Sequence, residues 1–270
     1  GDLTYKYNIL ENSTKTIKEI VNNEHILSEK IINSKNPSII IGQSALKLKS
    51  GSYIFEELKK FLLNNNKINN EWNALNIISE HASSVGSFDL GIYNLNEREN
   101  SVLSNLKNNN YELIFLLGQD NLEFKKNNEF IIYQGSHGDR GAEIADVVLP
   151  SAAYTEQNGL YENLEGRIQE CKKASYPIGE ALEDWKIFNL IMKKLNKTEN
   201  LSNFDSLRKE VLNLIPNFSK FNELPIYKDN SIKKNETSFI SEDILIREMD
   251  YYFSNSISRA SKTMNECRQI

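Results

Sequence analysis

The chain has 270 residues, a formal net charge of −5 and no block of consecutive lysines and arginines, so the electrostatic signature of a nucleic-acid-binding protein is missing. No apolar run approaches the roughly 18 residues of a membrane-spanning helix, and the first residues lack the apolar core of a signal peptide. Cys171 and Cys267 are the only cysteines and lie far apart, which argues against a zinc site or an iron–sulfur cluster held by this chain alone and favours a reducing compartment.

Four short apolar runs, each stopped by glycine or proline, are the predicted strands. They cover residues 39–41, 113–117, 130–133 and 144–150. Uninterrupted apolar runs of this length are typical of strands that are buried on both faces, which indicates a mostly parallel sheet.

Two amphipathic segments, residues 51–65 and 181–195, are the predicted helices beside this sheet. Their apolar stripes consist of Phe55, Leu58, Phe61 and Leu62 in the first segment, and of Trp185, Phe188, Ile191 or Met192, and Leu195 in the second. Glu183 and Asp184 suit the first turn of the second helix, because carboxylates there interact favourably with the helix dipole.

The alternation of strands and helices predicts an α/β fold with a doubly wound, mostly parallel sheet over residues 1–195. Residues 196–270 show a weaker pattern and are predicted to form a less regular C-terminal extension. This extension contains a helix near residues 204–214 and a short helix that Ser254 or Asn255 caps.

The turns that end the predicted strands are the first candidate for a site. They contain Gly42, Gly118, Gly135 and Pro150, and the carboxyl ends of parallel strands form the usual ligand crevice of an open α/β sheet. The simpler interpretation is that these residues only permit tight turns. Because no glycine-rich phosphate-binding motif is present, a dinucleotide site is not supported.

A polar cluster follows the third predicted strand. It consists of His137, Asp139, Arg140 and Glu143. A histidine and an aspartate this close can share a proton or bind a metal ion. The alternative is structural, because neighbouring Asp and Arg residues commonly pair with each other or cap a turn.

A second polar stretch follows the fourth predicted strand. Its charged and amide side chains include Glu156, Glu162, Asn163, Glu165 and Arg167. The glutamates are a candidate acid/base set, but the simpler role is to accept hydrogen bonds from the loop backbone and to bind Arg167. No serine lies near a histidine in a nucleophilic arrangement, so the residues predict a site-shaped architecture without a competent set of reacting groups.

Longer motifs resemble a known family. The stretch "GSHGDRGAEIADVVLPSAAYTEQNGLYENLEGRIQ", followed by "EDWKIF", resembles the molybdopterin oxidoreductases. The stretches "DLTYKYNIL", "EWNALNII", "ASSVGSFDLG" and "SISRASKTMNEC" are further similar to the large iron–sulfur subunits of respiratory complex I of the mitochondrial and alphaproteobacterial type. The resemblance covers nearly the whole chain and is weak only across residues 196–248.

This resemblance implies a molybdopterin-oxidoreductase-like fold that has lost its cofactor, and it assigns no catalytic or metal-binding residue. The candidates for the rim of such a relic site are His137, Asp139, Arg140, Glu156, Asn163, Glu165 and Arg167. The family's cluster-binding cysteines have no matching position here. The resemblance therefore implies no cofactor bound by this chain and iron–sulfur clusters in a partner N-terminal half, present as a separate polypeptide or lost from a fragment.

The implied role is that of a scaffold in the peripheral arm of complex I, on the matrix side of the mitochondrial inner membrane, in contact with other peripheral-arm subunits. Two alternatives remain at this point. One is a fragment of an active molybdenum or tungsten oxidoreductase such as a formate dehydrogenase, which requires a metal ligand in a pterin cleft and a further pterin-binding domain. The other is a free-standing nucleotide-binding α/β domain, which the missing phosphate loop disfavours.

Overall fold

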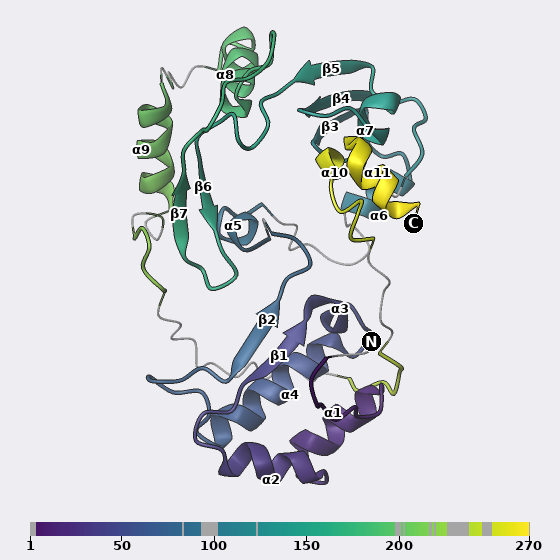
Figure 1. Cartoon of the computed structure of the whole chain (residues 1–270), viewed down its shortest axis with the longest axis vertical. Coiled ribbons are helices and arrows are strands. Elements are labelled where there is room, and N and C mark those ends of the chain that lie inside the picture. Colours follow the sequence, from purple (N-terminus) through teal and green to yellow (C-terminus); the bar gives the residue numbers. More distant parts are fainter. Residues whose placement is uncertain are drawn as a thin grey trace. The chain divides into compact units, whose positions relative to one another are not determined.

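The computed structural model describes residues 4–82, 84–92, 102–122, 124–197, 201, 203–215, 218, 220–225, 238–244 and 250–269. The chain forms two compact units (Figure 1). Unit 1 contains residues 1–85 and 224–247, and unit 2 contains residues 86–223 and 248–270. The predicted division at residue 195 follows the sequence pattern and differs from this boundary, because two parts of the C-terminal region pack against different units.

Unit 1 is a small helix and strand assembly around a pair of parallel strands. Its elements are α1 (Thr14–Val21), α2 (Ile26–Asn33), β1 (Ile39–Gly42), α3 (Gln43–Leu46), α4 (Gly51–Asn64) and β2 (Leu75–Ile78). Strands β1 and β2 pair in parallel, with Ile39 opposite Leu75, and α4 lies between them in the chain as the crossover helix.

The core of unit 1 forms where α4 packs against the strand pair. Leu58, Phe61 and Leu62 of the predicted stripe are buried, and Phe55 packs against the same cluster from its edge, so the predicted helix face is confirmed. Gly51 permits the close start of α4, because a Cβ there would lie 2.0 Å from the carbonyl oxygen of Leu46.

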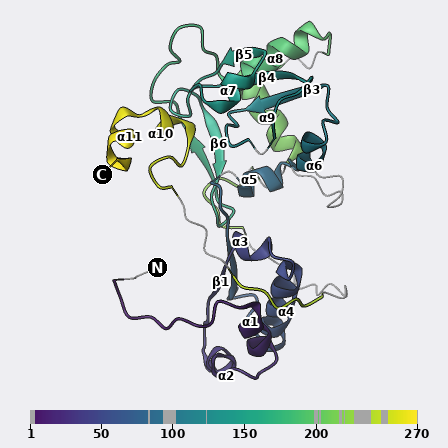
Figure 2. The same ribbon diagram turned by 90° about the vertical axis from the view of Figure 1, so that its right-hand side faces the viewer.

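Residues 238–244 from the C-terminal region are bound to unit 1 near the start of α1 and α4 (Figure 2). The Thr14 hydroxyl donates to the carbonyl oxygen of Ile240 at 3.0 Å and accepts from the backbone N–H of Glu242 at 3.1 Å. The Ser50 hydroxyl donates to the same Ile240 carbonyl at 2.7 Å. The Ser50 N–H, at the start of α4, donates to the Glu242 carboxylate at 2.8 Å.

Unit 2 is built on a parallel sheet in the order β3-β4-β5. Its strands are β3 (Leu113–Leu117), β4 (Phe130–Gly135), β5 (Val147–Pro150), β6 (Gly159–Glu162) and β7 (Ile168–Cys171). Its helices are α5 (Ser84–Asp89), α6 (Val102–Lys107), α7 (Arg140–Ile144), α8 (Asp184–Lys194), α9 (Phe204–Leu214), α10 (Ser256–Ala260) and α11 (Lys262–Arg268). The α/β class and all four predicted strands are confirmed, but the parallel strands are divided between one sheet in each unit rather than joined in a single layer.

The two faces of the three-stranded sheet are covered to different extents. One face buries Leu116, Ile131 and Tyr133 beneath α7 and its flanking turns. On the other face, Phe115 of β3 contacts Phe188 of α8, with ring centroids 5.7 Å apart. Apolar side chains of this second face that stay exposed are Leu113, Leu117, Phe130 and Val147.

Helix α8 forms as predicted, but its buried face differs from the predicted stripe. Ile187 is the buried side chain, whereas Met192 and Leu195 are exposed. The carboxylate of Asp184 stands in the first turn, as expected. The helix thus contacts the sheet mainly by its first half, and the apolar side chains of its second half remain open to solvent.

Strands β6 and β7 form an antiparallel hairpin in a stretch that the sequence pattern indicated to be a loop. Their apolar and polar residues alternate over only four positions each, which is too short for a clear signal. The helix at residues 204–214 is confirmed as α9, and Asn255 rather than Ser254 caps α10. Figure 2 shows α10 and α11 side by side near the C-terminus.

Candidate functional site

The carboxyl ends of β3, β4 and β5 lie at one edge of the sheet and bring three of the four predicted turns together. The N–H of Gly118 donates to the carbonyl oxygen of Gln134 at 2.7 Å, and Gly135 pairs with Pro150. Gly118 has a φ of +59°, a conformation that favours glycine. Gly42 ends β1 in the other sheet, so the predicted crevice contains three of these turns and not four.

Asp120, in the turn after β3, is the central buried carboxylate at this edge. One of its oxygens accepts from the N–H of Gly141 at 3.0 Å, and the other accepts from the Tyr133 hydroxyl at 3.3 Å. A Cβ at Gly141 would lie 2.5 Å from the carbonyl oxygen of Gln119, so glycine is required for this approach. Asp120 was not among the predicted candidates, because its turn carries no motif.

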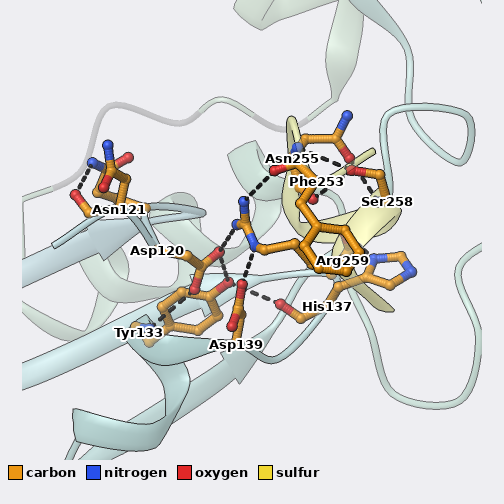
Figure 3. A network of polar contacts seen from close by, with 12 residues as sticks. Asp120, Asn121, Tyr133, His137, Asp139, Phe253, Asn255, Ser258 and Arg259 are labelled. Carbon is orange, nitrogen blue, oxygen red and sulfur yellow. Dashed lines mark hydrogen bonds and ion pairs between the residues drawn. The ribbon is translucent and has the colours of Figure 1, made fainter. Parts of the chain in front are cut away.

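Arg259 of α10 reaches this carboxylate from the C-terminal region (Figure 3). Its Nε donates to the carboxylate of Asp139, and its Nη2 lies 3.7 Å from Asp120 Oδ2. Its Nη1 donates to the carbonyl oxygen of Phe253 at 3.3 Å. The position at which a sheet of this kind usually takes a ligand is therefore occupied by a guanidinium group of the same chain.

Tyr133 stays protonated in this network. Burial raises the pKa of its hydroxyl to about 12, and the neighbouring Asp120 carboxylate adds to the rise. The single hydroxyl proton faces two acceptors, Asp120 and the carbonyl oxygen of His137, the latter at 2.9 Å. The hydroxyl is thus a fixed donor that holds the two turns together.

The predicted His137 and Asp139 lie in the same turn but bind different partners. The ring Nδ1 of His137 is 3.0 Å from the Ser136 hydroxyl, whereas Asp139 binds Arg259. The expected pairing of Asp139 with Arg140 is therefore replaced by pairing with an arginine 120 positions away. Arg140 begins α7 and is exposed. Asp139 stands at the N-cap position of α7 without a side-chain capping bond.

Glu156, Asn163 and Glu165 satisfy nearby backbone groups. Glu156 accepts from the N–H of Ala153 at 3.0 Å. In the turn between β6 and β7, Asn163 Oδ1 accepts from the N–H groups of Glu165 and Arg167, at 3.0 and 2.9 Å. The Nε of Arg167 is buried without a hydrogen-bond partner in the described part of the chain.

Two further polar groups in unit 2 were missed by the sequence reasoning. Burial raises the pKa of Glu162 to about 7, and the Asp89 carboxylate on α5 raises it further. Separately, Asp184 accepts from Gln134 of β4 at 2.7 Å and from Gln157 at 3.0 Å, which ties the start of α8 to the sheet. Neither contact has a sequence signal, because the partners are distant in the chain.

These groups provide hydrogen bonds and charge pairing, and the described residues contain no group of three His, Cys, Asp or Glu side chains arranged to hold a metal ion. Among the helices in the described ranges, none combines the length and apolar character needed to cross a membrane. The geometry supports a structural role for the strand-end turns, which are held by Tyr133, Asp120 and Arg259.

Two family models match the chain in succession. The molybdopterin oxidoreductase model matches residues 1–194, and a model of the C-terminal region of the NADH-ubiquinone oxidoreductase G protein matches residues 228–267. The chain belongs to the molybdopterin oxidoreductase family. The resemblance predicted from the motifs is thus confirmed.

The relatives specify a particular branch of this family. The chain is 37% identical over 275 residues to the NADH-ubiquinone oxidoreductase 75 kDa subunit of Reclinomonas americana, an alignment that covers 100% of this chain and 39% of the relative. It is 36% identical over 267 residues to the G-type subunit of the NADH-quinone oxidoreductase of Rickettsia bellii, covering 98% of this chain and 37% of the relative. It is 33% identical over 253 residues to the mitochondrial NADH-ubiquinone oxidoreductase 78 kDa subunit of Candida albicans, covering 89% of this chain and 34% of the relative. The chain therefore spans less than half the length of these relatives.

Proposed function

We propose that this chain is the carboxyl-terminal, molybdopterin-oxidoreductase-like part of the large iron–sulfur subunit of NADH:quinone oxidoreductase, respiratory complex I. In this role it is a scaffold of the peripheral arm on the matrix side of the mitochondrial inner membrane, and it supports electron transfer from NADH to ubiquinone without holding a redox centre itself. The observation that carries the proposal is the match of two family models, in order, along one chain.

The second family match favours this role over the alternatives. A formate-dehydrogenase-like fragment shares the molybdopterin oxidoreductase fold, but the match over residues 228–267 is to the C-terminal part of an NADH-ubiquinone oxidoreductase subunit. The relic-site candidates also fit a scaffold. Glu156 and Asn163 bind the backbone of their own segments, and Asp139 binds Arg259.

The absence of a redox centre remains part of the proposal and rests on the cysteines. Cys171 ends β7 and Cys267 lies in α11, and both are free thiols. Two cysteines do not supply the ligand set of a cluster. We therefore place the iron–sulfur clusters in a partner N-terminal half of the subunit.

Exposed apolar side chains support the proposed packing against that half and other peripheral-arm subunits. Leu113, Leu117 and Phe130 are exposed on the second face of the three-stranded sheet. Parallel sheets normally have both faces covered, so such a face is suited to bury against protein. We expect an interface of at least about 2,000 Å² of total buried surface.

Co-purification tests the proposal. The chain is tagged in its own cells, extracted in mild detergent and isolated, and the bound polypeptides are identified by mass spectrometry. We expect cluster-binding and NADH-oxidising subunits in fixed stoichiometry. Recovery of the tagged chain without any of them would contradict the assignment.

Metal content tests the redox part of the proposal separately. The chain is released from its partners under denaturing conditions that keep tightly bound metal with its ligands, and iron, molybdenum and tungsten are measured. We expect none of the three in stoichiometric amount. Stoichiometric molybdenum or tungsten would favour the pterin-dependent alternative, and stoichiometric iron would show a cluster on this chain.

A further inference from the structure

The C-terminal helices α10 and α11 are attached to unit 2 by one side chain. Neither helix contains a buried residue, so no apolar core holds them in place. Within the described residues, the hydrogen bonds and ion pairs that join residues 250–269 to the sheet and its turns are made by Arg259. The attachment of the segment therefore depends on the surroundings of one guanidinium group.

The receiving surface matches the shape of a guanidinium group. Asp120, whose side chain is 1% exposed, and Asp139 present carboxylate oxygens to two different nitrogens of Arg259. The third nitrogen donates to the carbonyl oxygen of Phe253. A planar group with fixed donors satisfies all three acceptors at once, whereas the compact ammonium of a lysine does not.

The acceptors are in place independently of the arginine. Asp120 is fixed by the Gly141 N–H and the Tyr133 hydroxyl, which belong to α7 and β4. Asp139 lies directly before α7. Removal of the guanidinium would thus leave two carboxylates without their shared cation, one of them buried, in an arrangement that other elements maintain.

The segment also presents the arginine in a defined conformation. Asp250 accepts from the N–H groups of Tyr252 and Phe253, both at 3.1 Å, which shapes the turn before α10. Asn255 and Ser258 form a reciprocal capping box at the start of α10. These contacts are internal to the segment, so they orient Arg259 without attaching the segment to the sheet.

We propose that Asp120 and Asp139 form a guanidinium-binding site at the carboxyl end of β3 and β4, and that the chain fills this site with Arg259. Residues 250–269 act as a latch that closes over the strand-end turns and keeps the site occupied. The ligand class is a guanidinium cation. The inference does not rest on the proposed role in respiration, because it uses only contacts within unit 2.

Hydrogen exchange followed by mass spectrometry tests the latch in the protein as it is purified. We expect Arg259→Ala to speed exchange of the α10 and α11 amides by about 10-fold or more, since a charge-assisted hydrogen bond is worth at least that factor. Arg259→Lys should give a smaller rise, because an ammonium retains the charge but not the fork. Arg208→Ala is the matched control: Arg208 binds Glu170 at 2.7 Å between α9 and β7 and should leave α10 and α11 unchanged.

Addition of small cations tests the site itself. With Arg259→Ala, methylguanidinium at millimolar concentration should restore slow exchange in residues 113–120 and 130–141, while α10 and α11 stay fast because the added cation is not linked to them. Methylammonium at equal ionic strength should restore less. If Arg259→Ala does not fold, Asp139→Asn provides the same latch measurement, because Asp139 is partly exposed and Asp120 keeps its other partners.

Each result supports or overturns the proposal. Unchanged exchange of α10 and α11 in both Arg259→Ala and Asp139→Asn would show that the latch is held by other contacts. Equal effects of methylguanidinium and methylammonium on Arg259→Ala would show that Asp120 and Asp139 form an ordinary acidic surface and not a guanidinium site. The same response to methylguanidinium in the unmodified chain, where Arg259 occupies the site, would also overturn it.

Discussion

Two parts of the C-terminal region attach to the two compact units by different physical means. Residues 238–244 are held on unit 1 mainly by neutral hydrogen bonds from Thr14 and Ser50, and Thr14 is fully buried. Residues 250–269 are held on unit 2 by Arg259, whose side chain is 31% exposed. The first attachment belongs to the protected interior, whereas the second is an ion-pair contact at the surface. The difference indicates that the same region is fixed at one place and releasable at the other.

The largest expected effect comes from removing the buried carboxylate that receives the latch. Asp120→Ala leaves Arg259, the Tyr133 hydroxyl and the Gly141 N–H without their acceptor. We expect the free energy of unfolding of unit 2 to fall by about 3 kcal/mol, measured by urea denaturation. Asp205 in the first turn of α9 is the control, and Asp205→Ala should cost less than about 1 kcal/mol. Equal losses in the two variants would show that Asp120 is not a structural centre.

A smaller loss is expected at the neutral attachment. Thr14→Val keeps the side-chain volume but removes the hydroxyl that binds Ile240 and Glu242. The free energy of unfolding of unit 1 should fall by about 1 to 2 kcal/mol, because buried backbone groups lose a partner. Thr16 is also buried in α1, and the described part of the chain shows no side-chain hydrogen bond for it, so Thr16→Val is the control. A loss as large in the control would assign the effect to packing.

Salt should separate the two attachments in the unmodified chain. Raising sodium chloride from about 0.1 to about 1 M shortens the screening length from about 10 to about 3 Å. Exchange of the α10 and α11 amides should then become severalfold faster, because Arg259 is partly exposed. Exchange in residues 238–244 should stay constant. A parallel response of both segments would contradict the assignment of different forces to the two attachments.

The effect of pH on unit 2 should be smaller and should involve Glu162. Its folded pKa of about 7 exceeds its ordinary value of 4.5, so between these values the folded state binds more protons than the unfolded state. The stability of unit 2 must therefore fall as pH rises from about 4.5 to about 7 through this group. Glu162→Gln should flatten that part of the stability curve and raise the melting temperature at pH 8. Glu165→Gln, in the exposed turn of the same hairpin, is the control and should leave the curve unchanged.

Local features of the fold were predictable from the sequence. The strands ending at Gly118, Gly135 and Pro150 are continuous apolar runs, and the stripe of Leu58 and Phe61 on α4 follows the helical repeat. These signals arise from neighbouring residues. The arrangement of each strand and its turn depends on the same few positions, so a short window of sequence contains the information.

Contacts between distant segments were not predictable in the same way. The partner of Asp139 is 120 positions away, and no residue near Asp139 indicates Arg259. Asp120 resembles any polar turn residue until Gly141 and Tyr133 are placed beside it. The α8 stripe was assigned to the wrong face because helical spacing does not show which apolar side meets the sheet, and only Ile187 is buried there.

Turnover per assembled complex tests most directly the claim that this chain supplies structure and not redox chemistry. His137→Ala and Glu156→Ala are introduced separately in cells, and NADH-linked quinone reduction is divided by the amount of assembled complex. Both residues bind their own turns, so we expect less assembled complex with unchanged turnover for each complex that forms. Normal assembly together with a collapse of turnover would show that these residues take part in the reaction and would contradict the scaffold role.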